Sequence, residues 1–222
     1  MTMKAAILED RRRGPRNWAA MAGAWLTVLI TGLAIAGLWP ASASAAGPRV
    51  FLLRGWFGVF STGLDGMAEE LKAQGADVEV AGHMYWSTAV KKILSERAAG
   101  QNRRLVLVGH SQGANNVIDI ARALQSHGVT VDLLVTISPF WQNAVPANVV
   151  KAVNYYQAPG WGAPLEADSG FHGRINNVNL VGDLTVTHVT MDKNQKIQAE
   201  IVREIAALPQ PSGEQKPASV SR

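Results

Sequence analysis

The stretch from Arg104 to Asp119, RLVLVGHSQGANNVID, decides the fold. Its first part, residues 105–109, is a short apolar run that predicts a buried strand. The chain then turns at Gly-His-Ser-Gln-Gly, residues 109–113, and continues with apolar residues at helical spacing: Ala114, Val117, Ile118, Ala121 and Leu124. A strand, a Gly-x-Ser-x-Gly turn and a helix in this order predict a nucleophile elbow, in which Ser111 projects from the end of the sheet.

The spacing of this turn has a physical cause. Gly109 and Gly113 have no Cβ atoms, so the strand and the helix can approach each other closely. The helix directs the N–H groups of its first turn, with their partial positive charge, at the place where an oxyanion would form. The alternative is that both glycines merely pack a strand-to-helix crossover, with no chemistry at Ser111.

The rest of the chain alternates between strand-like and helix-like segments. Strands are predicted at 49–54, 77–81, 105–109, 131–137, 149–156 and 175–181, and helices at about 62–74, 87–99, 112–127 and 192–208. Alternation of this kind predicts an α/β fold with a mostly parallel sheet of about six strands and helices on both faces. Ligands of such sheets bind at the carboxyl ends of the strands. The chain leaves no room for an inserted lid domain.

Three regions differ in composition. Residues 1–46 contain a basic start, an uncharged apolar run of 22 residues from Trp18 to Trp39, and a small-residue segment with Ala-x-Ala sites. This pattern predicts a secretory signal peptide, or alternatively a retained N-terminal membrane anchor, because the run is long enough to span a bilayer. Either way we expect an exported domain at 47–208, and the Pro- and Ser-rich residues 209–222 predict a disordered tail.

Charge and cysteine content exclude several classes of function. The formal net charge is +4, but residues 1–46 hold five basic and two acidic side chains, which leaves the remaining chain almost neutral. We therefore expect no nucleic-acid partner. The chain has no cysteine, which excludes disulfides, a thiol nucleophile and cysteine-ligated metals. Nothing in the sequence implies a metal or an organic cofactor, and it does not indicate the oligomeric state.

A serine nucleophile needs a histidine base, which is usually oriented by a carboxylate. His188 lies after the last predicted strand and before the last helix, where the base is expected. The predicted strand that follows the elbow helix ends in Ser138, so it supplies no carboxylate there. Asp168, after the next strand, is the best-placed acid, and Asp183 is the alternative. Asp192 is predicted to cap the last helix.

The oxyanion site requires two backbone N–H donors. The first is expected from Gln112, directly after the nucleophile, and the second from Trp56 in the glycine-containing loop after the first strand. Aromatic residues follow several predicted strands: Trp56, Phe57, Phe60, Trp86, Phe140, Trp141 and Trp161. They indicate either an apolar acyl pocket or a roof over a small core.

On these motifs the chain resembles the α/β-hydrolase superfamily, in a compact, lidless form similar to small thioesterase- or lipase-like serine hydrolases. The resemblance rests on residues 109–113, on Arg-Gly-Trp at 54–56 in the place of the family's oxyanion segment, and on Thr187-His188. It implies an acid after the strand that follows the elbow helix, in a Thr-x-Asp-Pro pattern. Here that segment reads Thr136-Ile-Ser138-Pro139, which departs from the family.

Two hypotheses follow. The first is a serine hydrolase that acts on a small-molecule ester or thioester, with Ser111 as nucleophile, His188 as base and Asp168 as acid. A peptidase on the same fold is a variant of it. The second, motivated by Ser138, is a catalytically degenerate hydrolase fold that binds a ligand or a partner. Contact with a membrane is expected only through the N-terminal segment, if that segment is not cleaved.

Overall fold

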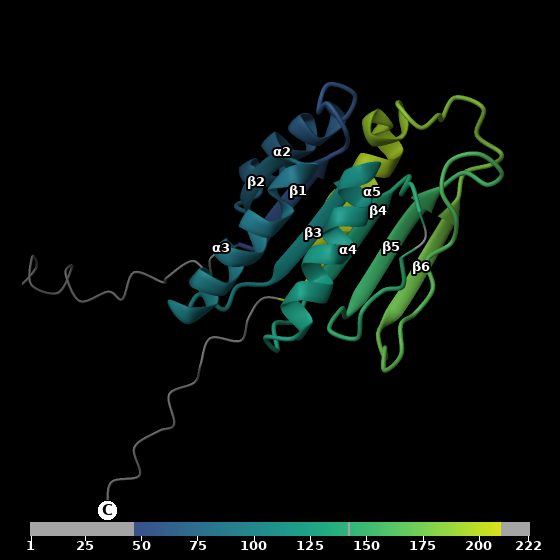
Figure 1. Ribbon diagram of the computed structural model, residues 1–222. Coiled ribbons are helices and arrows are strands. Elements are labelled where there is room, and N and C mark those ends of the chain that lie inside the picture. The colour runs from purple at the N-terminus through teal and green to yellow at the C-terminus, as the bar shows by residue number, and fades with distance from the viewer. Residues whose placement is uncertain (1–46, 142, 210–222) are drawn as a thin grey trace, which may run out of the picture. The chain divides into compact units, whose positions relative to one another are not determined.

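Six parallel strands form the centre of the computed structural model, which describes residues 47–141 and 143–209. They are β1 (Arg49–Arg54), β2 (Asp77–Gly82), β3 (Leu105–His110), β4 (Leu133–Ile137), β5 (Lys151–Tyr156) and β6 (Arg174–Asn179). Their order across the sheet is β2-β1-β3-β4-β5-β6 (Figure 1). The six predicted strands are therefore all present, and every pairing between them is parallel.

Two of the strands begin later than predicted, and a side chain explains the difference. Val131 and Val149 pair only as an isolated bridge outside β4 and β5. Between that bridge and β4, the Asp132 carboxylate accepts hydrogen bonds from the backbone N–H of Leu105 and from the Arg104 side chain. A carboxylate here takes the place of a strand partner, so the regular ladder starts at Leu133.

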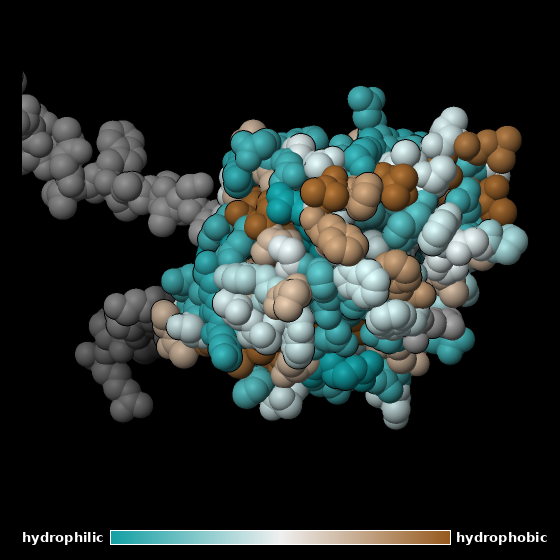
Figure 2. All heavy atoms as spheres, turned by 45° about the horizontal axis from the view of Figure 1, so that its top comes forward, coloured by the Kyte–Doolittle hydropathy of each residue, from teal (hydrophilic) through white to brown (hydrophobic). Residues whose placement is uncertain are grey.

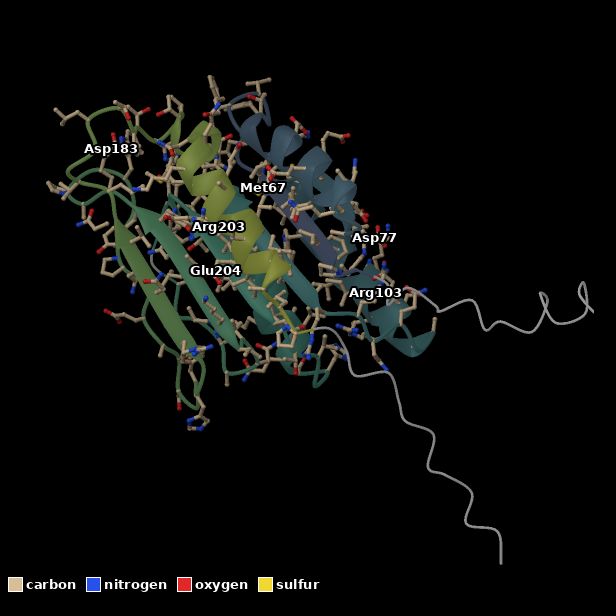
Figure 3. The ribbon with its side chains drawn as sticks, turned by 180° about the vertical axis from the view of Figure 1, so that it is seen from behind. Met67, Asp77, Arg103, Asp183, Arg203 and Glu204 are labelled. Atoms are coloured by element: carbon tan, nitrogen blue, oxygen red, sulfur yellow. The ribbon has the colours of Figure 1, made fainter. Side chains whose placement is uncertain are left out.

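Four helices cover the sheet on both faces, as predicted. On one face, toward the viewer in Figure 1, lie α3 (Trp86–Ala98) and α4 (Gln112–Gln125). On the other face, toward the viewer in Figure 3, lie α2 (Gly63–Ala73) and α5 (Gln195–Ala206). Each pair of helices buries one apolar cluster against the sheet. Two short 3-10 helices, η1 (His83–Tyr85) and η2 (Met191–Lys193), precede α3 and α5.

The start of the last helix corrects one prediction. Asn194, not Asp192, caps α5, because the Asn194 side chain accepts hydrogen bonds from the N–H groups of Lys196 and Ile197. Asp192 is fully buried in η2, and its Oδ2 accepts the N–H of Gly63 at 2.8 Å. The carboxylate predicted to cap its own helix therefore binds the first residue of α2 instead, 129 positions away.

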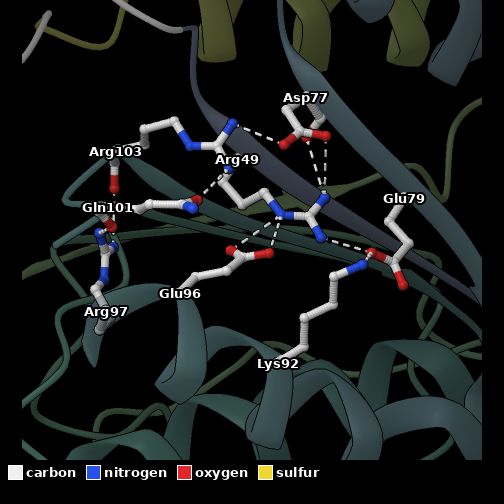
Figure 4. A network of polar contacts seen from close by, with 8 residues as sticks. All are labelled: Arg49, Asp77, Glu79, Lys92, Glu96, Arg97, Gln101 and Arg103. Carbon is white, nitrogen blue, oxygen red and sulfur yellow. Dashed lines mark hydrogen bonds and ion pairs between the residues drawn. The ribbon is translucent and has the colours of Figure 1, made fainter. Parts of the chain in front are cut away.

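At the amino-terminal end of β1, the buried Arg49 joins β1 to β2 and α3 (Figure 4). Arg49 is 4% exposed and contacts the carboxylates of Glu79, at 2.5 Å, and Glu96, at 3.1 Å. Burial alone would raise the pKa of Glu79, but hydrogen bonds from Lys92, Tyr85 and Arg49 hold it at about 2. This network stabilises the sheet far from the carboxyl ends of the strands.

The topology of the sheet marks the place for a ligand. From β1 the sheet extends to β2 on one side and to β3 on the other, so the loops after β1 and β3 diverge at this point. In open parallel sheets the ligand crevice forms where the strand order reverses in this way. A Cβ on Gly113 would lie 2.1 Å from the carbonyl oxygen of Leu53, so only glycine allows α4 to start this close to β1.

The predicted leader at 1–46 and all but Pro209 of the predicted tail lie outside the described residues. Among the residues that the structure does describe, no helix is long and apolar enough to cross a membrane. The predicted boundaries of the domain, residues 47–208, stay a prediction.

Candidate active site

Ser111 occupies a strained turn between β3 and α4. Its φ of 59° and ψ of −126° lie in a region that residues with a side chain rarely adopt. The turn is held by a 2.9 Å hydrogen bond from the Ser111 N–H to the carbonyl of Ile137, and the residue is 6% exposed. This is the geometry of a nucleophile elbow, so the fold brings the predicted serine to the carboxyl end of the sheet.

The predicted base reaches the predicted nucleophile. His188 lies in the loop between β6 and η2, and its Nε2 is 3.0 Å from the Ser111 Oγ. Two aromatic rings pack close to the imidazole: the ring centroid of Trp161 lies 4.6 Å away, and that of Phe140 5.4 Å away. From the sequence, Trp161 was one of the aromatic residues that indicated either a pocket or a roof over the core, and nothing indicated that its indole packs against the base.

Ser138 contacts the ring nitrogen of His188 that does not face the nucleophile. Its Oγ lies 2.6 Å from the Nδ1 of His188, where a carboxylate was expected. Ser138 follows β4 directly, is 1% exposed and has a φ of 51°, in the left-handed region that Asp and Asn tolerate best. The sequence identified this position as the place for the acid, and only the residue type argued against it.

Serine and a carboxylate act differently at this position. A carboxylate only accepts, so it forces Nδ1 to carry the proton and leaves Nε2 free to accept the proton of Ser111. The Ser138 hydroxyl can accept from Nδ1–H or donate to Nδ1, so it is compatible with both tautomers of His188. In the productive tautomer, Nδ1–H donates to Ser138 and Nε2 accepts from Ser111.

The environment keeps His188 neutral. Burial and, to a smaller extent, the neighbouring His110 lower its pKa to about 4, whereas the charge of Asp192 acts in the opposite direction. A neutral imidazole is the form that can accept a proton. Because no carboxylate contacts Nδ1, nothing beside the ring stabilises the imidazolium strongly.

The predicted acid, Asp168, is not at the base, and this prediction is corrected. Asp168 is half-buried and forms an ion pair with Arg122 of α4, and its other oxygen accepts the N–H of Ser169. The Arg122 guanidinium is also the main reason that the pKa of Asp168 is lowered. The side chain serves the loop between β5 and β6 rather than the imidazole.

The alternative acid, Asp183, also has hydrogen-bond partners other than the base. Its carboxylate accepts hydrogen bonds from the backbone N–H and the hydroxyl of Thr185, the shorter at 2.6 Å, in the loop after β6 (Figure 3). These hydrogen bonds from Thr185 hold the carboxylate in a local turn and lower the pKa of Asp183. Neither of the two carboxylates considered from the sequence therefore completes a triad.

The predicted oxyanion donors flank the nucleophile. Gln112 begins α4, so its N–H has no partner within the helix. The loop after β1 packs directly on Ser111, because a Cβ on Gly55 would lie 2.7 Å from the Ser111 Cβ. The Gly55 N–H is already used, since it donates to the Ser61 Oγ at 3.0 Å. The next N–H along this loop belongs to Trp56, which lines the same cavity as Ser111.

A small apolar cavity of about 180 Å³ opens beside the nucleophile. Besides Ser111, His188 and their buried neighbours, it is lined by Trp56, Phe57, Phe60, Phe140 and Val189. No carboxylate, lysine or arginine is among its lining residues. These five side chains are themselves exposed, and several brown and tan residues lie on the face of the molecule that Figure 2 shows. Of the two readings of the aromatics, a pocket lining fits Trp56, Phe57, Phe60 and Phe140.

Metal-binding groups do not gather at this site or elsewhere in residues 47–141 and 143–209, where no three carboxylate or imidazole side chains come together to hold an ion.

The nucleophile after the third strand, the position after the fourth strand and the histidine before the last helix follow the chain order of one fold. The fold is that of the α/β-hydrolases. No family model and no curated protein matches the sequence.

Several solved structures are similar to this chain. Human thioesterase 2 is 13% identical, with a TM-score of 0.47 over 74% of this chain and 100% of that one. The RedJ thioesterase of the prodiginine pathway in Streptomyces coelicolor is 12% identical, with a TM-score of 0.45 over 75% and 98%. A protein of Xanthomonas campestris assigned to the alpha/beta hydrolase superfamily is 16% identical, with a TM-score of 0.43 over 72% and 99%.

Proposed function

We propose that the protein is a serine hydrolase that cleaves esters or thioesters of small, uncharged acyl groups. The observation that carries this proposal is the 3.0 Å contact between the Ser111 Oγ and the His188 Nε2, with Ser111 held on a nucleophile elbow. A structural serine has no need of a strained backbone and a neutral imidazole within hydrogen-bond distance.

The proposed reaction uses the groups in this order. The Ser111 Oγ attacks the substrate carbonyl carbon while His188 takes the hydroxyl proton at Nε2, and the N–H groups of Gln112 and Trp56 bind the developing oxyanion. The imidazolium then gives its proton to the leaving alcohol or thiol, which leaves an acyl-enzyme. Water, deprotonated by the same nitrogen, hydrolyses this ester and restores Ser111. Ser138 holds the Nδ1–H throughout.

The cavity supports the substrate class. A volume of about 180 Å³ is small beside the roughly 300–1,000 Å³ of most small-molecule pockets. A charged acyl group would meet aromatic walls without a counter-ion, and burying an unpaired charge is costly. We therefore expect neutral, short acyl chains.

Labelling with a fluorophosphonate probe tests the proposal. The wild-type protein should be labelled once, at Ser111, and Ser111→Ala should not be labelled. Ser126→Ala is the matched control, because Ser126 is exposed at the end of α4 and its hydroxyl only donates to the carbonyl of Ala123. Labelling of Ser111→Ala at the wild-type rate, or no labelling of the wild-type protein, would overturn the proposal.

Ser138 favours a second candidate, a hydrolase fold that binds a ligand without turning it over. It predicts that the aromatic cavity binds a short-chain ester while Ser111 stays unlabelled and the ester stays intact. Calorimetric titration with a non-hydrolysable ether analogue, next to the labelling experiment, separates the two candidates. Binding of the ether without any labelling supports the second, whereas labelling and turnover exclude it.

The sequence of residues 1–46 supports a location outside the cytoplasm, and we propose that the reaction takes place there. Cell fractionation, with N-terminal sequencing of the exported protein, tests both the location and the cleavage near Ala43 or Ala45. Recovery of the protein from the cytoplasm alone would refute this part of the proposal.

A further inference from the structure

A buried chain of hydrogen bonds joins the three loops that the proposed reaction needs. It starts at the Gly55 N–H, which donates to the Ser61 Oγ at 3.0 Å. The Ser61 Oγ lies 2.8 Å from the Nδ1 of His110. The chain ends at the carbonyl oxygen of His188, 2.8 Å from the Nε2 of His110. Ser61 and His110 are both 1% exposed, so water does not compete for these bonds.

The chemistry of the groups fixes the direction of these bonds. A carbonyl oxygen only accepts, so the His110 Nε2 carries a proton and donates it to His188. In the neutral ring the Nδ1 then accepts, which makes the Ser61 hydroxyl its donor. The Ser61 oxygen accepts the Gly55 N–H in turn. Burial lowers the pKa of His110 to about 4, in agreement with a neutral ring.

We propose that His110 is a positioning residue that holds the main chain of the base and, through Ser61, the oxyanion loop in register with the elbow. This inference rests on the proposed function. In a triad with a carboxylate, the acid orients the imidazole. Here the contact at Nδ1 is a serine that accepts or donates, and His110 orients the base from its backbone side instead.

A second, exposed contact joins the loop after β1 to the loop after β6. The Lys193 Nζ donates to the carbonyl oxygens of Phe60 and Val189, both at 2.7 Å. Because this lysine is exposed, water can replace its hydrogen bonds to the two carbonyls at little cost, although Lys193→Met also removes the cation that lies 3.8 Å from the buried Asp192 carboxylate. A Lys193 variant therefore serves as the comparison for the His110 variants. It tests whether the loss of any contact between these loops lowers activity, or only the loss of the buried contact through His110.

Two substitutions each remove one half of the His110 contacts. His110→Asn keeps an amide near the position of Nδ1 and loses the donor to His188. His110→Gln keeps an amide N–H near the position of Nε2 and loses the acceptor for Ser61. His127→Gln, at an exposed position at the end of α4, is the matched control. All variants are made in the full chain and compared at one pH by kcat, KM and thermal unfolding.

We expect His110→Asn to lower kcat for a p-nitrophenyl ester by about ten- to a hundredfold, with KM changed less than threefold. His110→Gln should lower kcat less than His110→Asn does. His127→Gln should equal the wild type, and Lys193→Met should lose less than threefold. Wild-type kcat in His110→Asn, or equal losses in Lys193→Met and His110→Asn, would overturn the inference.

Two further readouts separate positioning from a loss of fold. In the wild type the His188 Nδ1–H should give a downfield proton resonance, because its heavy-atom distance to Ser138 is 2.6 Å. That resonance should shift or broaden in His110→Asn and persist in His127→Gln. The double variant His110→Asn with Ser138→Ala should lose less than the product of the single losses, because both residues position the same imidazole. An unchanged resonance or multiplicative losses would contradict the inference, whereas absent wild-type labelling would instead refute the proposed function.

Discussion

Removal of the Ser138 hydroxyl should cost far less activity than removal of the acid from a Ser-His-Asp triad. In Ser138→Ala, the Nδ1–H of His188 loses the partner that lies 2.6 Å away. His188 is only partly buried, so water can take over part of this bond. The loss should therefore stay near the net value of a neutral hydrogen bond, about 0.5–1.5 kcal/mol.

Converted at about 1.36 kcal/mol per tenfold change in rate, this range lowers kcat by about two- to thirteenfold. In triads with a carboxylate, replacing the acid by its amide lowers kcat by about 10⁴-fold, because the wrong tautomer is then favoured. Ser138 cannot impose the tautomer as strongly as a carboxylate, so its removal cannot cost as much. KM should stay unchanged, because Ser138 does not line the cavity.

The assay is the initial rate of hydrolysis of p-nitrophenyl butyrate, with the fraction of active sites titrated by a fluorophosphonate. Ser126→Ala accompanies Ser138→Ala as the control for the loss of a serine hydroxyl. A loss above about 10³-fold would show that Ser138 does more than accept one hydrogen bond. No loss at all would show that the contacts of Trp161 and Phe140 hold the ring without it.

Other variants test the remaining parts of the site and the fold. Asp168→Asn should leave kcat/KM within twofold of the wild type in the same ester assay, and a tenfold loss would return Asp168 to the triad. The kcat/KM of the wild type should fall as pH drops through about 4, where His188 gains a proton, and the midpoint should move up in Ser138→Asp because a carboxylate favours the imidazolium. Circular dichroism across the same pH range separates this titration from unfolding, and a wild-type midpoint near 6.5 would contradict the low pKa. Arg49→Met should lower the free energy of unfolding in urea by about 2–4 kcal/mol, because it leaves carboxylates clustered without their cation, and wild-type stability would refute this role. Phe60→Ala should move the preferred acyl chain of p-nitrophenyl esters to a longer length, and an unchanged preference would show that Phe60 does not bound the pocket.

The elbow and the base could be predicted from the sequence because both follow from local pattern and topology. Gly109 to Gly113 fixes a strand-turn-helix unit, and a histidine between the last strand and the last helix must lie at the carboxyl edge of the sheet. These two inferences need no knowledge of any loop's path. The structure places the Ser111 Oγ and the His188 Nε2 3.0 Å apart accordingly.

The acid could not be predicted in the same way, because its choice depended on long-range contacts. Asp168 lies in a loop of suitable topology, but Arg122, 46 positions earlier on α4, binds its carboxylate. Asp192 matches the local pattern of a helix cap, yet it binds the N–H of Gly63, 129 positions away. The sequence shows that Ser138 occupies the place of the acid in the fold, but it does not show that the Ser138 hydroxyl contacts the base.

The exchange of a carboxylate for Ser138 separates two tasks that an acid performs together. One is to orient the imidazole. Here the aromatic contacts share that task with the hydrogen bond from the His110 side chain to the backbone carbonyl of His188. The other is to stabilise the imidazolium, and no group in contact with Nδ1 does so here. His188 is then a weaker base, neutral over a wide pH range, and the proton transfer that activates Ser111 is less favourable. A weak base suffices where the carbonyl is reactive and the leaving group departs readily, as in a thioester or an activated ester. An amide demands more of the base, so under the proposed function we expect esters and thioesters to be better substrates than peptides.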